Sequence, residues 1–239
     1  IQTILTAKPY SLQRQAKAKV LLLSDLHGPY KLAFETNRQG AAAFLLLQEG
    51  PFSFESWAIQ QTLSQALESA FYETLRTKQQ TAYIAKAWDD EKEKQLLQYF
   101  AVQSSTHTPT DLLARFELFL EDFGKNLPLE ISLERFEKIR TSLITSLAMR
   151  PENMFNKAIE TTKLAFYYQD FEWINKQIDS LKALSYDNFC LAAQELISRK
   201  NSRRLAILVE GVMADDKNFR YELTSKEDVQ ALGQLTSVN

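Results

Sequence analysis

A short stretch in the first half of the chain places several hydrogen-bonding side chains between two different secondary-structure patterns. An apolar helical stripe runs from Ile59 to Leu75, and a strand-like pattern begins at Thr81. Between and just beyond these limits lie two cations, two amides and a phenol, in the order Arg76, Lys78, Gln79, Gln80 and Tyr83. A turn between packed elements holds its side chains in place while leaving them free to carry function.

Two of these side chains have chemistry that suits a peptide ligand. The guanidinium of Arg76 carries several donors in a fixed plane, which match peptide carbonyl groups. The hydroxyl of Tyr83 can donate to a carbonyl oxygen as negative charge develops on it. Each residue also has an ordinary structural interpretation: Arg76 as a cation at a helix C-terminus, and Tyr83 as a strand tyrosine. The residues alone leave both interpretations open.

A second candidate for chemistry is the Asp25-Leu26-His27 sequence, which follows a short apolar run. It resembles the first metal-binding motif of calcineurin-like metallophosphoesterases, in which Asp and His bind one metal of a two-metal site. Such a site needs several further ligands, but the chain has one other histidine, His107. We therefore interpret Asp25 and Gly28, with Pro29, as a hairpin turn with His27 on the surface.

Composition excludes several other classes. A net charge of −2 gives no overall attraction to nucleic acid or to an anionic membrane. No apolar run approaches the ~20 residues that a membrane-spanning helix needs. The single cysteine, Cys190, excludes an internal disulfide and a cysteine-rich metal site, and its apolar helical surroundings indicate a buried thiol. A glycine-rich phosphate loop and a G-x-S-x-G elbow are both absent from the sequence.

The first half of the chain must position these residues through strands and one long helix. Three strand-length runs are predicted at residues 19–24, 30–36 and 41–48, and their close spacing favours an antiparallel meander. Ser53 is the predicted N-cap of the long helix. Two further strands, 81–88 and 95–104, are predicted to be joined by a charged turn at 89–94.

The second half is predicted to be helical until a final strand. Thr108 and Pro109 mark a helix start, and Gly124 is its predicted end. Further helices are expected at 132–149, from Pro151 to about 168, at 173–181, and from a Ser185 cap to 198; a strand follows at 205–210. This order predicts an α+β domain with a mainly antiparallel sheet and helices packed on one face.

The expected domain covers residues 18–211. Residues 1–17 are predicted to lead into it or to be the remnant of a preceding linker, and residues 212–239 form a polar tail. Because the chain opens on Ile1 and carries no signal-peptide pattern, we expect it to be a fragment of a longer protein.

The stretch around Arg76 resembles a segment of the insulinase/pitrilysin family of zinc metallopeptidases. In the last domain of that family the segment reads Leu-Arg-Thr-(Lys/Glu)-x-Gln-x-Gly-Tyr; the matching residues here are Leu75, Arg76, Thr77, Lys78, Gln80 and Tyr83. Ala82 replaces the usual glycine, and Phe71-Tyr72 fits the pitrilysin-like branch. The order of elements over residues 18–211 is also similar, including a proline break at Arg150-Pro151.

The resemblance implies homologous α+β domains arranged in two halves that close around a chamber. The family binds zinc in its first domain through H-x-x-E-H and a distant glutamate. That motif is absent here, so the resemblance implies no catalytic or metal-binding residue in this fragment and zinc in the N-terminal half of the full-length protein. It further implies that Arg76 and Tyr83 hydrogen-bond a peptide substrate near the scissile bond, while Lys78 and Gln80 shape the turn.

The expected function is that of a C-terminal, non-catalytic domain of a zinc-dependent endopeptidase, inactive on its own. Its expected partners are the N-terminal catalytic half of the same protein and a peptide substrate, with no nucleic acid and no membrane span. The alternative is a catalytically inactive scaffold or interaction domain of the same superfamily. An H-x-x-E-H motif upstream of Ile1 would favour the peptidase over the scaffold.

Overall fold

A five-stranded sheet forms one layer of the domain. The computed structural model describes residues 18–213, together with 225, 227 and 231. The strands are β1 (Tyr30–Gln39), β2 (Ala41–Pro51), β3 (Ile84–Lys92), β4 (Gln95–Ser104) and β5 (Arg204–Val212). Their order in the sheet is β1-β5-β2-β4-β3; β1 and β5 are parallel, and the other pairs are antiparallel.

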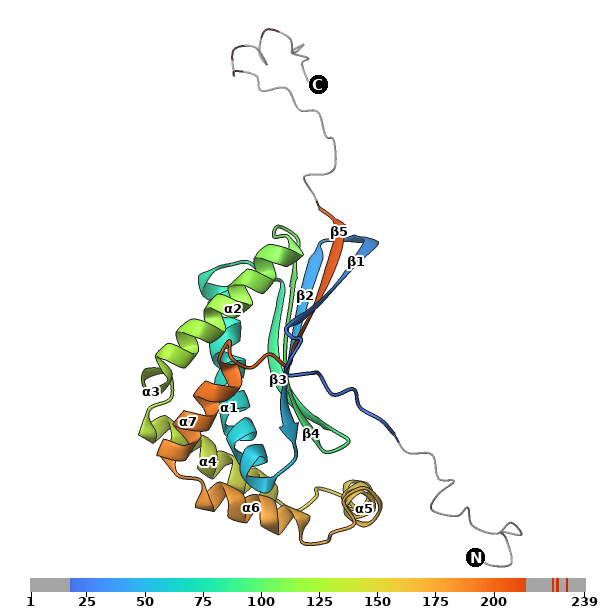
Figure 1. Ribbon diagram of the computed structural model, residues 1–239, viewed down its shortest axis with the longest axis vertical. Coiled ribbons are helices and arrows are strands. Elements are labelled where there is room, and N and C mark those ends of the chain that lie inside the picture. Colours follow the sequence, from blue (N-terminus) through green and yellow to red (C-terminus); the bar gives the residue numbers. More distant parts are fainter. Residues whose placement is uncertain (1–17, 214–224, 226, 228–230, 232–239) are drawn as a thin grey trace, which may run out of the picture.

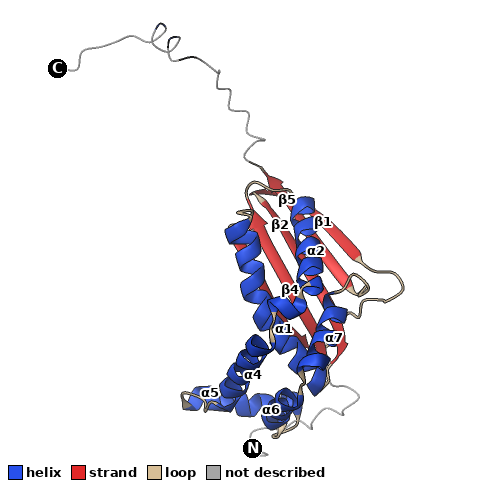
Figure 2. Cartoon of the chain, turned by 90° about the vertical axis from the view of Figure 1, so that its left-hand side faces the viewer, coloured by secondary structure: helices blue, strands red, loops and turns tan. Residues whose placement is uncertain are grey.

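The helices form a second layer on one side of this sheet (Figure 1). They are α1 (Phe54–Tyr72), the π-helical turn η2 (Glu73–Lys78), α2 (Pro109–Lys125), α3 (Leu127–Glu130), α4 (Leu133–Ala148), α5 (Met154–Thr162), the π-helical turn η3 (Lys163–Tyr168), α6 (Trp173–Ala183) and α7 (Tyr186–Ile197). Figure 2 shows α1, α2 and α7 in front of the strands. The predicted α+β class, with helices on one face of a mainly antiparallel sheet, is confirmed.

The core lies between the sheet and α1 and α2. In β2, Ala43, Leu45 and Leu47 face the helices and are at most 1% exposed, as the alternation of side chains along a strand requires. Phe71 of α1 joins three elements, because its ring centroid lies 5.2–5.3 Å from those of Phe100 in β4 and of Phe116 and Phe119 in α2. Burial of these rings fixes α1, and with it the segment that follows Phe71.

The helix starts agree closely with the sequence. The side chains of Ser53, Thr108 and Ser185 each accept a hydrogen bond from the backbone N–H three residues later, which is the expected N-cap geometry. The predicted stop at Gly124 is wrong by one residue, since α2 continues to Lys125. Gly124 instead allows close packing, because a Cβ there would lie 3.3 Å from Cδ1 of Ile197.

Two strand predictions are wrong. Residues 19–24 form no strand; the amide side chain of Gln48 accepts from the Leu23 N–H (2.7 Å) and donates to the Leu21 carbonyl (3.1 Å). These bonds replace strand pairing, so Asp25 to His27 form a turn but not a hairpin. The predicted meander is also wrong, because β5 lies between β1 and β2.

Several boundaries shift. The helix predicted to start at Pro151 is α5, which begins at Met154 and is capped by Asn153. Strand β3 continues through most of the charged run 89–94, leaving Glu93 and Lys94 as the turn with positive φ. Trp57 and Trp173 are buried whereas Trp88 is 38% exposed, and Cys190 is half-buried. The predicted segment 1–17 and most of the predicted tail 212–239 lie outside the described residues.

Candidate functional site

The turn after α1 is held by buried residues. The helix widens into η2 and ends near Gln79, whose N–H donates to the Thr74 carbonyl at 3.0 Å. Leu75 has no exposed surface, and its carbonyl accepts from both the N–H (3.0 Å) and the hydroxyl (2.8 Å) of the buried Thr81. Gln80 takes a positive φ of 52°. The turn therefore has a fixed inner side, and π-helical turns of this kind are often found at functional sites.

Arg76 and Tyr83 lie on the exposed side of this turn. Arg76 is exposed, and its guanidinium carbon lies 5.1 Å from the ring centroid of Tyr72, a cation–π arrangement that limits the freedom of the side chain. Within residues 18–213, no carboxylate forms an ion pair with Arg76. Tyr83 is 77% exposed, while its backbone N–H donates to the Gln103 carbonyl at 2.9 Å. Both side chains offer donors toward solvent from a fixed backbone.

The remaining polar residues of the turn have partners within the domain. Lys78 pairs with Glu73 at 3.2 Å. The side-chain oxygen of Gln79 accepts from Nη1 of Arg115 on α2 at 3.0 Å. These contacts give Lys78 and Gln79 partners within the domain; the turn-shaping role expected for Lys78 and Gln80 stays a prediction.

Tyr83 leads directly into the helix-free face of the sheet. Register places Ile84, Trp88, Tyr99 and Phe44 on this face, and no described helix lies over it (Figure 1). The rings of Phe44, Trp88 and Tyr99 contact one another with centroids 5.2–6.0 Å apart. The result is an aromatic surface that extends from the turn across three strands.

The Asp25-Leu26-His27 sequence is not assembled into a metal site. Oδ1 of Asp25 lies 3.1 Å from Nε of Arg203, so its carboxylate already has a cation. His107 lies near Ser104 and Thr106, on the loop after β4. Among the described residues, no group of three or more His, Cys, Asp or Glu side chains is placed to hold a metal ion. None of the described helices has the length and apolar character to cross a membrane.

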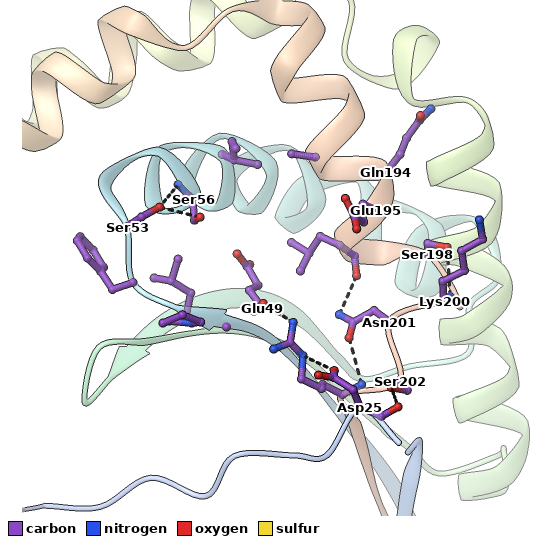
Figure 3. Close-up of a pocket in the computed structure, with 18 residues that line it drawn as sticks. Asp25, Glu49, Ser53, Ser56, Gln194, Glu195, Ser198, Lys200, Asn201 and Ser202 are labelled. Atoms are coloured by element: carbon purple, nitrogen blue, oxygen red, sulfur yellow. Dashed lines mark hydrogen bonds and ion pairs between the residues drawn. The ribbon is translucent and has the colours of Figure 1, made fainter. Parts of the chain in front are cut away.

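A cavity that the sequence did not predict lies at the opposite end of α1. Its volume is about 1050 Å³, and it is bounded by the end of β2, the first turn of α1, the end of α7 and the segment before β5 (Figure 3). Glu49 of β2 is directed into it, beneath Ser53 and Ser56 (Figure 3). Oε1 of Glu49 is buried and has no hydrogen-bond donor. The only hint in the sequence is a glutamate at the end of an apolar strand.

Burial dominates the electrostatics of Glu49. Burial raises the pKa of the Glu49 carboxyl to about 8. A hydrogen bond with Gln60 and the positive charge of Arg203 lower this pKa, whereas the negative charge of Asp89 raises it further. Arg203 donates from Nη2 to the Glu49 carbonyl oxygen (2.7 Å) and pairs with Asp25, so its charge is already engaged. Glu49 is therefore an acid without a cation of its own.

Comparison with known proteins shows what the domain is similar to. Residues 62–162 match the family described as PQQ synthase PqqF-like, C-terminal lobe domain 4. Protease 3 of Salmonella typhi is 26% identical over 145 residues, which is 61% of this chain and 14% of the relative. A nardilysin-like protein of Arabidopsis thaliana is 24% identical over 210 residues, 85% of this chain and 20% of the relative. The chain is similar to C-terminal domains of the insulinase/pitrilysin family.

The fold of the domain agrees with that of a solved pitrilysin structure. The crystal structure of pitrilysin superposes with a TM-score of 0.64 at 20% identity, covering 82% of this chain and 21% of that chain. The domain thus spans between about one seventh and one fifth of the length of the relatives it matches. The rest of such a protein lies outside this chain.

Proposed function

We propose that this chain is the non-catalytic C-terminal domain of a zinc-dependent endopeptidase, and that Arg76 and Tyr83 contact the peptide substrate. The supporting observation is the pair of exposed donors on a turn whose inner side is fixed by Leu75 and Thr81. In this proposal the zinc-binding residues belong to the N-terminal half, which closes with this half around a chamber.

Each of the two residues has a defined role in the proposal. The guanidinium of Arg76 donates to carbonyl oxygens of an extended peptide and orients it. The hydroxyl of Tyr83 donates to the scissile carbonyl oxygen as negative charge develops on it. A zinc ion bound by the other half would supply Lewis-acid chemistry for peptide hydrolysis. The contribution of this chain is to bind and position the substrate and to stabilise charge.

The structure favours these roles through preorganisation. Arg76 stacks over Tyr72, so less side-chain freedom remains to be lost when a substrate binds. The backbone N–H of Tyr83 donates to the Gln103 carbonyl of β4, which fixes the backbone position from which the phenol side chain extends. The neighbouring aromatic surface of Phe44, Trp88 and Tyr99 offers rigid apolar contacts for substrate side chains. A chamber wall needs this combination of fixed donors and apolar area.

The test is peptide hydrolysis by the full-length polypeptide carrying Tyr83→Phe or Arg76→Ala. Loss of one donor to a developing oxyanion lowers kcat by roughly 10²-fold in comparable sites, so we expect a decrease of that order in kcat/KM for Tyr83→Phe. Tyr72→Phe is the matched control, because it removes a hydroxyl from a neighbouring exposed tyrosine while keeping the ring under Arg76. Wild-type rates in both site variants would overturn the assignment.

The second candidate is an inactive scaffold or interaction domain. The activity and sequence of the wild-type full-length protein distinguish this candidate from the first. Peptide hydrolysis by the full-length polypeptide, together with an H-x-x-E-H motif in its N-terminal half, supports the peptidase. Absence of both from the full-length polypeptide would support the scaffold.

A further inference from the structure

The cavity at the N-terminal end of α1 is a separate site. Helix α1 has 19 residues, so at 1.5 Å per residue its two ends lie roughly 28 Å apart. The cavity is therefore distant from Arg76 and Tyr83, which follow the other end. Its volume of about 1050 Å³ is at the upper end of the range for ligand sites, about 300–1,000 Å³. This is more space than one side chain fills.

Glu49 brings an acceptor atom to the inner end of this cavity, and Gln60, which does not line the cavity, lies behind it. Oε1 of Glu49 is buried without a donor. Gln60 lies beside it on α1, is 1% exposed, and donates from Nε2 to the Leu97 carbonyl at 3.1 Å. That bond turns Oε1 of Gln60 away from Leu97, and this oxygen also has no donor. Buried oxygens without donors are costly, so a ligand that brings N–H groups to them would be favoured.

Part of the cavity wall is apolar and part carries hydroxyl and amide side chains, while the mouth carries mixed charges. Apolar side chains from β2, α1, β4 and α7 and their junctions line it, namely Phe52, Ile59, Leu96, Ala192 and Leu196. At the mouth, Asp25 is paired with Arg203 at 3.1 Å, while Glu195 and Lys200 carry opposite charges. The charges at the mouth balance, which leaves Glu49 as the unpaired acid.

We propose that this cavity binds a polypeptide segment through one arginine or lysine side chain, with the cationic group at Glu49 and the aliphatic part against the apolar walls. Arginine and lysine combine an apolar stem with a head that only donates hydrogen bonds. The apolar stem suits the apolar part of the cavity wall, and the donating head suits the acceptor of Glu49 at its inner end. The site does not depend on the substrate role of Arg76 and Tyr83.

The charge state of Glu49 predicts that binding depends on pH. Asp89 on β3, Arg203 before β5, and Asp25, Glu195 and Lys200 around the cavity are the charged groups that face it. With its pKa near 8 the carboxyl is mostly protonated at pH 7, and a bound cation favours the ionised form. Binding therefore releases a proton at pH 7 and becomes tighter as the pH rises from 6.5 to 8.5.

The experiment is a titration of the chain with the capped tripeptide acetyl-Ala-Arg-Ala-amide, followed by amide chemical shifts. The Lys peptide and a citrulline peptide, which has the same shape without the charge, are titrated in parallel. We expect saturable shifts at Ser56 and Asn201 with the Arg or Lys peptide. Glu49→Gln should weaken binding roughly tenfold or more and abolish its pH dependence, since a hydrogen bond to a charged group is replaced by a neutral one.

Glu55→Gln is the matched control, because Glu55 is an exposed acid in the same first turn of α1 that does not line the cavity. Its affinity should equal that of the wild type. Equal binding of the citrulline peptide, unchanged affinity of Glu49→Gln, the same shifts with CaCl₂ alone, or no saturable shifts at all would each overturn the proposal. The amide spectrum of Glu49→Gln without peptide verifies that the variant is folded.

Discussion

The two ends of α1 carry opposite kinds of surface. At the C-terminal end the helix continues into η2, where Arg76 and Tyr83 present donors to solvent above the buried Leu75 and Thr81. At the N-terminal end, Glu49 presents a buried oxygen without a donor inside a cavity. One helix therefore separates a donor site from an acceptor site.

The difference shows how each end would choose a ligand. Exposed donors lose little solvation until a ligand covers them, so the first end suits the carbonyl-rich backbone of an extended peptide. Buried acceptors have already lost their solvation during folding, so the second end favours a group that only donates. The predictions that follow test whether each end is built as the comparison requires.

The largest expected effect is at Arg204, which fixes the cavity end. This residue is 3% exposed and donates to the carbonyls of Ile197 and Ser198 (both 2.6 Å), while Nη1 pairs with Glu117 at 2.6 Å. Arg204→Leu removes the buried donor to Glu117 and to the Ile197 carbonyl, while the Ser198 carbonyl keeps the Asn201 N–H. We therefore expect the free energy of unfolding to fall by about 3–5 kcal/mol. Urea unfolding measures this.

The control for that variant is Arg199→Leu. Arg199 pairs with Glu121 at 2.8 Å, but its side chain is 64% exposed. An exposed pair contributes less than about 1 kcal/mol, and the loss should stay within that limit. Equal losses in the two variants would mean that the Arg204 contacts do not hold the end of α7.

The next largest effect is at the donor end. Leu75 has no exposed surface and anchors η2 beneath Arg76. Leu75→Ala leaves a cavity in the core, which costs about 2–5 kcal/mol for buried leucines. Leu118→Ala on α2, where the side chain is 55% exposed, should cost less than about 1 kcal/mol. A small loss at Leu75, comparable to that at Leu118, would mean that the turn is not anchored from within.

These two ends differed in how much the sequence revealed. The donor end is local: a helical stripe, a break and a strand lie within 25 residues, so the pattern located Arg76 and Tyr83 at an exposed turn. The acceptor end brings Glu49 and Gln60 together with Ser198 and Arg203, from two stretches that lie far apart in the sequence. Periodicity carries no information about such long-range neighbours.

The same reason explains the errors in the sheet. Caps such as Ser53 and Thr108 depend on bonds across three residues and were predicted correctly. The insertion of β5 between β1 and β2 depends on pairing across more than 150 residues. Residues 19–24 have a strand-like composition, but Gln48 binds their backbone through its side chain instead.

The third prediction concerns pH and the acceptor end. Since the folded-state pKa of Glu49 is raised from 4.5 to about 8, the folded protein binds this proton more tightly than the unfolded chain. The Glu49 contribution to stability is therefore most favourable below pH 4.5 and is lost as the pH rises toward 8. Between pH 5.5 and 8.5 the wild type should lose about 3 kcal/mol more than Glu49→Gln. Parallel stability profiles from urea unfolding would contradict a buried acid.

The smallest expected effect is at Thr81, on the strand side of the donor end. Its hydroxyl donates to the Leu75 carbonyl at 2.8 Å, and the same carbonyl also accepts from the Thr81 N–H at 3.0 Å. Thr81→Val keeps the shape and the backbone bond but removes the hydroxyl bond, so the free energy of unfolding should fall by about 1 kcal/mol. Thr145→Val on α4, where the hydroxyl bonds to the Thr141 carbonyl at an exposed site, should cost less, since water can replace that bond. If Thr81→Val proves as mild as the control, then packing of Leu75 alone fixes the backbone from which Arg76 and Tyr83 extend.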